Sequence, residues 1–247
     1  MSDSEFTLLV GSTFLLAGLI KGVIGLGLPT VAMGLLGLAM PPVEAAALLI
    51  VPSLVTNLWQ LIAGPRFGAL VRRLWPLLLG VVVGTVGGSG IIAGRGGRAA
   101  TAGLGVALAI YGATGLAKPR MRLQPAAETW AAPLVGLATG LVTGATGVFV
   151  IPAVPYLGSL GLERDALVQA LGLSFTVSTF ALAAGLVLHG ALPFATTATS
   201  LFAVAPALVG MALGGWLRAR FRPEMFRLCF FVGLMALGVE LILRGSP

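Results

Sequence analysis

The sequence predicts an all-α polytopic membrane protein. Hydrophobic residues make up 57% of its 247 residues and charged residues only 9%, whereas about a quarter of a soluble domain is charged. Long uncharged runs recur along the chain, and each provides the roughly 20 residues that a membrane-spanning helix needs. The 15 basic residues lie mainly between these runs, where they set the orientation of the spans. A water-soluble globule and a nucleic-acid-binding protein are therefore excluded.

Four apolar elements are expected in the first half of the chain, at about 6–38, 43–64, 73–94 and 99–117. The first is about 33 residues long and is interrupted between Gly22 and Pro29, because glycine and proline weaken or break helices. The other three each match one span. Glu44 follows two prolines in the first turn of its element, where a carboxylate complements the positive end of a helix.

Four more elements are expected in the second half, at about 130–158, 165–188, 194–217 and 226–243. The first of these is about 29 residues long and is interrupted between Gly140 and Pro152. Backbone that is not helical survives at membrane depth only where protein or a water-filled cavity satisfies its polar groups. The two interruptions therefore predict a cavity. Asp165 begins its element after Gly161, much as Glu44 does.

The positions of glycine and polar residues predict an internal duplication. The linker is placed at 121–128, between a first membrane repeat at 1–120 and a second at 129–247. Three sets of residues recur in the same order with growing offsets, as loop insertions in a duplicated unit require. The sets are Gly18 and Gly22 on Gly136 and Gly140, Ser53, Asn57 and Gly64 on Ser174, Ser178 and Gly185, and Pro76, Gly80 and Gly84 on Pro206, Gly210 and Gly214.

The distribution of Lys and Arg predicts how the halves cross the membrane. If every element crosses once, the two sides carry seven basic residues each. If the two interrupted elements each leave and return on one side, the counts become 11 and 3, which is a clear positive-inside bias. The second topology makes the halves inverted repeats whose broken first elements meet near the bilayer midplane, as in many secondary transporters.

Two stretches of the sequence resemble a known family. Gly18-Leu-Ile-Lys-Gly-Val-Ile-Gly-Leu-Gly-Leu-Pro29, together with residues 40–60, resembles the N-terminal signature of the TauE/SafE family of sulfite and organosulfonate exporters. Gly140-Leu-Val-Thr-Gly-Ala-Thr-Gly147 resembles the repeated motif of that family. The resemblance implies a multi-pass protein of the bacterial cell inner membrane that exports small sulfur-containing anions. The second half departs most, because Ser178-Thr-Phe-Ala181 replaces Asn57-Leu-Trp-Gln60, so a symmetric amide site is not expected.

The residues at the two interruptions independently favour an oxyanion. Lys21 is the only basic residue well inside an apolar element, where a charge is costly unless it is paired or functional. Glycine-rich breaks free backbone N–H groups at the N-termini of half-helices, where anions bind. The alternatives are that Lys21 extends to the membrane interface and that the glycines allow close helix packing. The candidate substrate-binding residues here are Lys21, Gly22, Gly25, Gly27, Gly144 and Gly147, with hydroxyls from Thr139, Thr143 and Thr146.

A polar stripe adds to the predicted site. Ser53, Asn57 and Gln60 share one face of their expected helix, and a polar face in an apolar helix should point inward. Ser174 and Ser178 are the counterparts in the second half, and hydrogen bonds between helices are the alternative for all five residues.

Two titratable residues are candidates for proton coupling. His189, the only histidine, lies in a short expected loop, where its imidazole is a candidate proton-coupling or gating group, while Glu240 lies inside the last apolar run. The alternatives are a polar loop residue for His189 and a side chain that reaches the interface for Glu240.

No pattern in the sequence predicts catalysis. The chain has no phosphate-binding loop for ATP and no zinc motif, and one histidine and one cysteine cannot build most metal sites. We therefore expect no cofactor, no metal and no enzyme, but a gradient-driven secondary transporter that works by alternating access. Uptake of another small organic anion and a non-transporting membrane scaffold remain alternatives. Coupling to a proton or other ion, and a homodimer, are compatible with the sequence.

Overall fold

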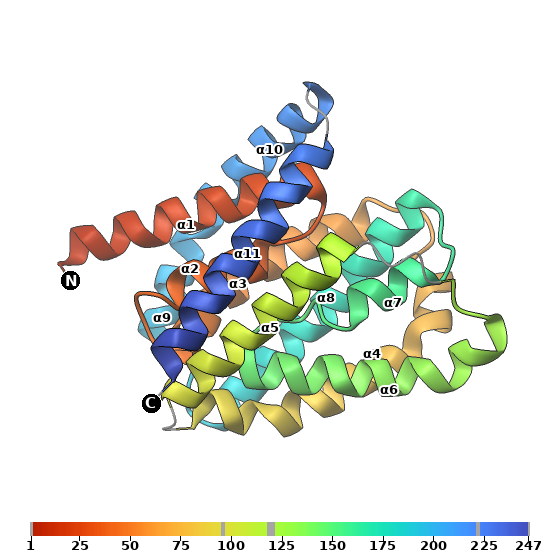
Figure 1. Ribbon diagram of the computed structural model, residues 1–247, viewed down its shortest axis with the longest axis horizontal. Helices are drawn as coiled ribbons and strands as arrows, with labels where there is room; N and C mark the ends of the chain where they lie inside the picture. Colours follow the sequence, from red (N-terminus) through yellow and green to blue (C-terminus); the bar gives the residue numbers. More distant parts are fainter. Residues whose placement is uncertain (1, 95–96, 118–121, 221–222, 247) are drawn as a thin grey trace.

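The computed structural model describes residues 2–94, 97–117, 122–220 and 223–246, which form eleven helices and no strand (Figure 1). The first-half helices are α1 (Asp3–Ile24), α2 (Leu28–Leu36), α3 (Pro42–Ile62), α4 (Phe67–Ala93) and α5 (Gly97–Ala117). The second-half helices are α6 (Pro125–Thr146), α7 (Ala153–Ser159), α8 (Arg164–Leu188), α9 (Phe194–Phe202), α10 (Val204–Arg220) and α11 (Pro223–Gly245).

The prediction of an all-helical membrane fold is confirmed. Within the described residues, seven helical stretches are long and apolar enough to cross a membrane: Asp3–Ile24, Pro42–Ile62, Phe67–Ala93, Gly97–Ala117, Arg164–Leu188, Ala198–Arg218 and Glu224–Gly245. The predicted element at 130–158 is not among them; it consists of α6 and the short α7. Residue 121 of the predicted linker lies outside the described residues, and α6 already begins at Pro125.

Both predicted interruptions are present as breaks between helices. α1 ends where Gly25 and Gly27 adopt left-handed backbone angles, with φ of 89° and 113°, and α2 begins directly afterwards. α6 ends in the same manner at Gly147, with φ of 73°. These angles are costly for any residue with a Cβ, so glycine permits both breaks. One further break, at Ala203 between α9 and α10, was not predicted; Pro206 lacks the N–H that would continue α9 through this point.

The α6–α7 element leaves and returns at one end of the molecule. The N–H of Leu123, just before α6, donates to the carbonyl of Ser159 at the end of α7, with N and O 3.1 Å apart. Arg73 also joins the two ends, because it binds Glu128 in the first turn of α6 and the carbonyl of Leu160. α2 finishes near the end of α11, where Arg244 donates to the carbonyl of Leu38.

Glycine allows two helix pairs to pack backbone on backbone. α1 runs parallel to α10, and α6 runs parallel to α4. A Cβ on any of the glycines in these contacts would overlap a backbone oxygen of the facing helix. Such small-residue contacts are typical of helices that pack in membranes. The residues are Gly18 and Gly22 with Gly210 and Gly214 in the first pair, and Gly136 and Gly140 with Gly80 and Gly84 in the second.

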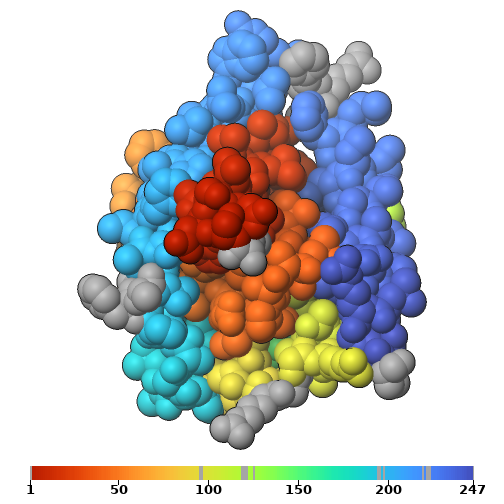
Figure 2. All heavy atoms as spheres, turned by 90° about the vertical axis from the view of Figure 1, so that its left-hand side faces the viewer, coloured from red at the N-terminus to blue at the C-terminus, as the bar shows by residue number. Residues whose placement is uncertain are grey.

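The centre of the molecule is the antiparallel pair α3 and α8, which are the most deeply buried of the candidate spans. Gln169 near the start of α8 donates to the carbonyls of Leu61 and Gly64 at the end of α3. α1 and α2 lie between α10 on one side and α11 on the other (Figure 2). Because α3 and α8 are antiparallel, α3 begins at one end of the molecule and α8 begins at the other.

The glycine contacts predict a sharp sensitivity to a single methyl group. Gly140→Ala should lower the free energy of unfolding by about 1–3 kcal/mol, because the new Cβ would overlap the Val81 carbonyl and force α6 away from α4. Gly87→Ala is the matched control, since a Cβ on Gly87 meets open space. Thermal unfolding in detergent measures both variants, and equal midpoints would argue against the close α4–α6 contact.

The antiparallel α3–α8 pair predicts which residues reach which side of a membrane. Glu44 begins α3 and Glu163 precedes α8, so cysteines at these positions should react with an impermeant maleimide from opposite sides of the bilayer. Glu44→Cys and Glu163→Cys are made separately in a Cys229→Ala protein, which has no other cysteine. Labelling of both from one side would contradict this arrangement.

Candidate functional site

Lys21 lies in the last turn of α1 and is only 3% exposed. Its Nζ donates to Thr56 Oγ1 at 3.1 Å and to Asn57 Oδ1, both on α3. Asn57 in turn donates to Thr179 Oγ1 on α8 at 3.4 Å. A lysine ammonium has three N–H donors, so one of them has no partner in the part of the chain that the structure describes. No ion pair among the described residues involves Lys21.

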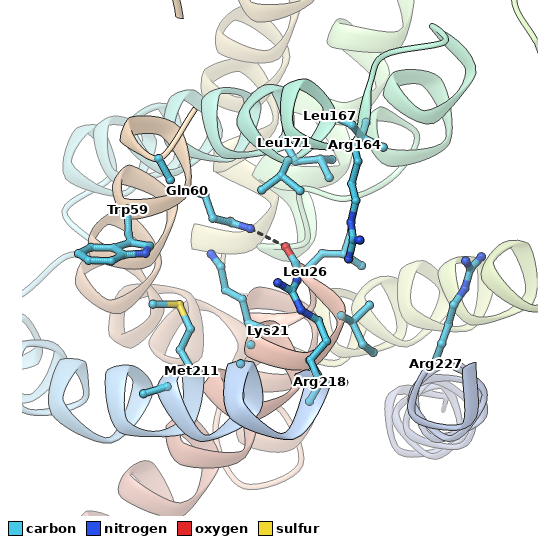
Figure 3. A pocket seen from close by; sticks show the side chains of 18 of the residues that line it. Lys21, Leu26, Trp59, Gln60, Arg164, Leu167, Leu171, Met211, Arg218 and Arg227 are labelled. Atoms are coloured by element: carbon cyan, nitrogen blue, oxygen red, sulfur yellow. Dashed lines mark hydrogen bonds between the residues drawn. The ribbon is translucent and has the colours of Figure 1, made fainter. Parts of the chain in front are cut away.

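A cavity of about 670 Å³ opens beside Lys21 (Figure 3). It lies between the α1–α2 break and helices α3, α8, α10 and α11. Its lining consists of Lys21, Gly22, Val23, Ile24, Gly25, Leu26, Trp59, Gln60, Ala63, Arg164, Leu167, Val168, Leu171, Leu208, Met211, Ala212, Gly215, Arg218, Glu224 and Arg227.

The outer part of the cavity is positively charged. Arg164 from α8, Arg218 from α10 and Arg227 from α11 surround it, and we call these three residues the arginine mouth. Arg164 and Arg218 are exposed and have no hydrogen bond or ion pair within the described residues. Arg227 lies over the Phe231 ring, 5.6 Å from its centroid. Among the described residues of the lining, Glu224 is the only acidic one, so positive charge dominates the entrance.

The helix break itself forms one wall of the cavity. Gln60 Nε2 donates to the Gly25 carbonyl at 2.6 Å, which satisfies one of the carbonyls that a helix end leaves open (Figure 3). Gly22 packs against α10 while also lining the cavity. Gly27 does not line the cavity. It packs against the Phe230 ring, which a Cβ at this position would press on.

α3 and α8 carry buried hydroxyls without partners among the described residues. Ser53, Ser174 and Ser178 are fully buried, and none of their hydroxyls has a hydrogen bond within the described residues. By contrast, Thr56 and Thr179 donate to carbonyls of their own helices. The hydrogen bond from Asn57 to Thr179 joins α3 to α8 next to Lys21.

The candidate residues of the second half lie apart from the cavity. The hydroxyls of Thr139, Thr143 and Thr146 each donate to the carbonyl four residues earlier in α6. Gly144 packs against α4, and Gly147 caps α6 beside the Met33 side chain. None of these five residues lines the cavity beside Lys21.

His189 and Glu240, the candidates for proton coupling, do not line the cavity. His189 ends α8 at the opposite end from Arg164, with Nδ1 2.8 Å from the Gly185 carbonyl oxygen and 3.4 Å from Ser89 Oγ. Glu240 is exposed on α11 and forms an ion pair with Arg244. Their roles stay predictions.

The arginine mouth is the part of the site that the sequence did not predict. Its three residues come from three different helix ends, and in the sequence they count only as charges between apolar runs. No spacing links them, so only the packing of α8, α10 and α11 brings them together. Within the described residues, no group of three or more His, Cys, Asp or Glu side chains is placed to hold a metal ion.

Taken together, the site is a membrane-embedded cavity with a buried cation at its inner end and guanidinium groups at its entrance. Such a cavity suits a small anion with several acceptor oxygens.

The chain was compared with protein families, curated proteins and solved structures. No curated protein and no solved structure matches the chain. The family model described as "Sulfite exporter TauE/SafE" matches residues 10–241, which is nearly the whole chain. The chain therefore belongs to the TauE/SafE family of membrane transporters.

Proposed function

We propose that this chain is a gradient-driven transporter of sulfite or small organosulfonates, and that Lys21 binds the anion. One N–H of the Lys21 ammonium has no partner among the described residues, and its position at the inner end of an arginine-lined cavity carries this proposal. An ionisable group inside a membrane protein marks a substrate path more often than a structural contact. The family description supports sulfur oxyanions as the substrate class.

The chemistry of the cavity fits a sulfonate group. Its oxygens carry negative charge and accept hydrogen bonds, so an ammonium and guanidinium groups can bind them with charge-assisted bonds. The cavity volume of about 670 Å³ lies in the range of small-molecule sites and exceeds what a bare sulfite needs. Apolar side chains such as Leu167, Leu171 and Met211 leave room for the short carbon chain of an organosulfonate.

The helix contacts support an internal duplication. Residues that align between the halves make equivalent contacts in the α1–α10 and α6–α4 pairs. In each of these contacts a glycine meets the backbone of the facing helix. The α1–α10 contact is given first and its α6–α4 equivalent second: Gly18–Ala207 and Gly136–Leu77, Gly22–Met211 and Gly140–Val81, Leu15–Gly210 and Pro133–Gly80, Leu19–Gly214 and Leu137–Gly84. Chance recurrence of glycine would not reproduce these partners in the same order.

The directions of the helices support inverted halves. α1 runs toward the arginine mouth, whereas α6 starts at that end and runs away from it. The described basic residues at helix ends divide unequally, which favours a cytoplasmic mouth by the positive-inside rule. Those at the mouth end are Arg66, Arg72, Arg73, Arg122, Arg164, Arg218, Arg220 and Arg227, against Arg98 and Arg244 at the far end; Arg95, Lys118, Arg120 and Arg222 lie outside the described residues.

An open cytoplasmic mouth is the arrangement that an exporter needs to collect its substrate. We therefore propose outward transport by alternating access across the inner membrane of a bacterium. The partners in this proposal are the anion, the lipid bilayer and a coupling ion, with His189 and Glu240 as candidates for a proton path. A scaffold subunit would need neither the cavity nor the spare donor of Lys21.

Replacing Lys21 should weaken anion binding strongly. In Lys21→Met the stem remains but the charge-assisted hydrogen bond is lost, which corresponds to about 1.5–3 kcal/mol, or roughly 10-fold to 150-fold in affinity. Ligand-induced stabilisation and flux are measured in reconstituted protein with sulfite, thiosulfate, sulfate, sulfoacetate and taurine at two pH values. Arg72→Gln is the control, because it removes one exposed positive charge from the same end without touching the cavity.

A selective response that Lys21→Met abolishes and Arg72→Gln preserves is the expected result. Unchanged affinity in Lys21→Met would show that the lysine has a structural role. Inward movement of the anion under a proton gradient would favour the uptake alternative. Silence across the whole panel would favour the scaffold.

The arginine mouth should affect how fast anions enter more than how tightly they are held. The double variant Arg164→Gln/Arg218→Gln is expected to raise the anion concentration at half-maximal flux about 10-fold, since charges at an entrance steer association by that order. The flux of this variant should also depend less on ionic strength. Flux measured from 20 to 500 mM of an inert salt tests this, and an unaltered salt dependence would contradict steering.

A further inference from the structure

The two halves of the structure differ in how the central helices meet their neighbours. Beside the α1–α10 pair, the cavity separates α3 from α10, so that Gln60 and Ala63 face Met211, Ala212 and Gly215 across open space. Beside the α6–α4 pair, α8 packs directly on α4.

The α4–α8 contact is tight enough to exclude any side chain at Gly185. A Cβ there would fall 2.5 Å from Ser89 Cβ and 2.7 Å from Ser89 Oγ. Thr85 and Ser89 are both fully buried. We call the contact of Thr85 and Ser89 with Gly185 and His189 the α4–α8 seam.

Residues that align with the cavity lining are the ones buried around this seam. At the offsets read from the sequence, Met211 and Gly215 align with Val81 and Thr85, Gln60 aligns with Ala181, and Lys21 aligns with Thr139. Val81, Thr85 and Thr139 are fully buried, and Ala181 is 4% exposed. The same positions therefore line a cavity in one half and a closed contact in the other.

The Thr85 hydroxyl supplies an independent indication. It is fully buried and has no hydrogen bond within the described residues. A buried hydroxyl without a partner is costly in an apolar medium, so a permanently closed seam would be expected to hold an apolar residue here. Thr85 lies where α4, α6 and α8 meet, because its backbone is next to Cβ positions on Gly140, Gly144 and Gly185.

We propose that the α4–α8 seam is the closed gate of a second anion cavity, which opens at the far end of the molecule when the arginine mouth closes. This inference rests on the proposed alternating access. Thr85, Ser89 and Thr139 would line the second cavity, with His189 at its entrance. Thr139 occupies the position equivalent to Lys21, so hydroxyls replace the cation. The far cavity therefore binds the same anion more weakly than the Lys21 site does, as a release site requires.

The test uses cysteine reporters that do not depend on which anion binds. Thr85→Cys reports the seam and Ala212→Cys reports the cavity at the mouth, both in a Cys229→Ala protein in proteoliposomes. Gly185→Ala places a methyl group against Ser89 and so disfavours the closed seam. We expect this variant to raise the labelling rate of Thr85→Cys from the far side about 10-fold. Gly87→Ala, whose Cβ meets open space on the same helix as Ser89, should leave the rate unchanged.

A second step asks whether the two openings exclude each other. Ala212→Cys is first modified from the mouth side with a bulky impermeant thiol reagent, which holds α3 away from α10. The labelling of Thr85→Cys in the Gly185→Ala protein should then return to the rate of the protein that keeps Gly185. If the raised rate persists, the methyl group has only loosened local packing and the coupled gate is wrong.

Two results keep this test separate from the substrate proposal. If Gly185→Ala does not fold, Ser89→Val adds the bulk from the α4 side of the same contact. No rise in the labelling rate with either folded variant overturns the gate.

Openings that exclude each other, combined with no flux of any anion in the panel, would retain the gate and reject the substrate class. Lys21-dependent flux without exclusive openings would retain the substrate class and reject the gate.

Discussion

The need to hold one cation inside an apolar environment organises this molecule. The Lys21 ammonium cannot be left bare in a membrane, and no carboxylate among the described residues pairs with it. Two of its three donors are satisfied by neutral oxygens of Thr56 and Asn57, which require α3 to pass directly beside the end of α1. Asn57 then continues the network to α8. Because neutral acceptors do not cancel its charge, the lysine keeps its attraction for an anion that enters from outside.

Glycine makes this arrangement sterically feasible. α1 reaches the centre of the protein because Gly18 and Gly22 let it lie against the backbone of α10, and it stops there because Gly25 and Gly27 adopt left-handed angles. The space beyond the break becomes the cavity. Glycine thus has two effects near the end of α1: it allows close packing against α10, and it ends the helix. Together these effects leave space for a cavity.

Much of the fold was predictable from the sequence, and much of the site was not. Apolar runs and glycine clusters predicted the helices and both interruptions, because span length and backbone freedom are local properties. The break at Ala203 was missed, since Pro206 near a helix start looks the same as proline inside a helix. Lys21 and Gln60 were predicted and do line the cavity, whereas the arginine mouth depends on three helix ends that only tertiary packing brings together. The α6 threonines satisfy themselves within their own helix, a choice that sequence alone does not reveal.

The two attachments between α1 and α3 restrict how these helices can move. Lys21 is fastened to Asn57, and the Gly25 carbonyl is fastened to Gln60, so the points of attachment on each helix are about one turn apart. Sliding α3 along α1 would break both bonds at once. A tilt of α3 about the line through the two attachments would break neither. Only a rotation about this line keeps both bonds, so in the proposed alternating access the cation lies on the axis about which α3 would turn.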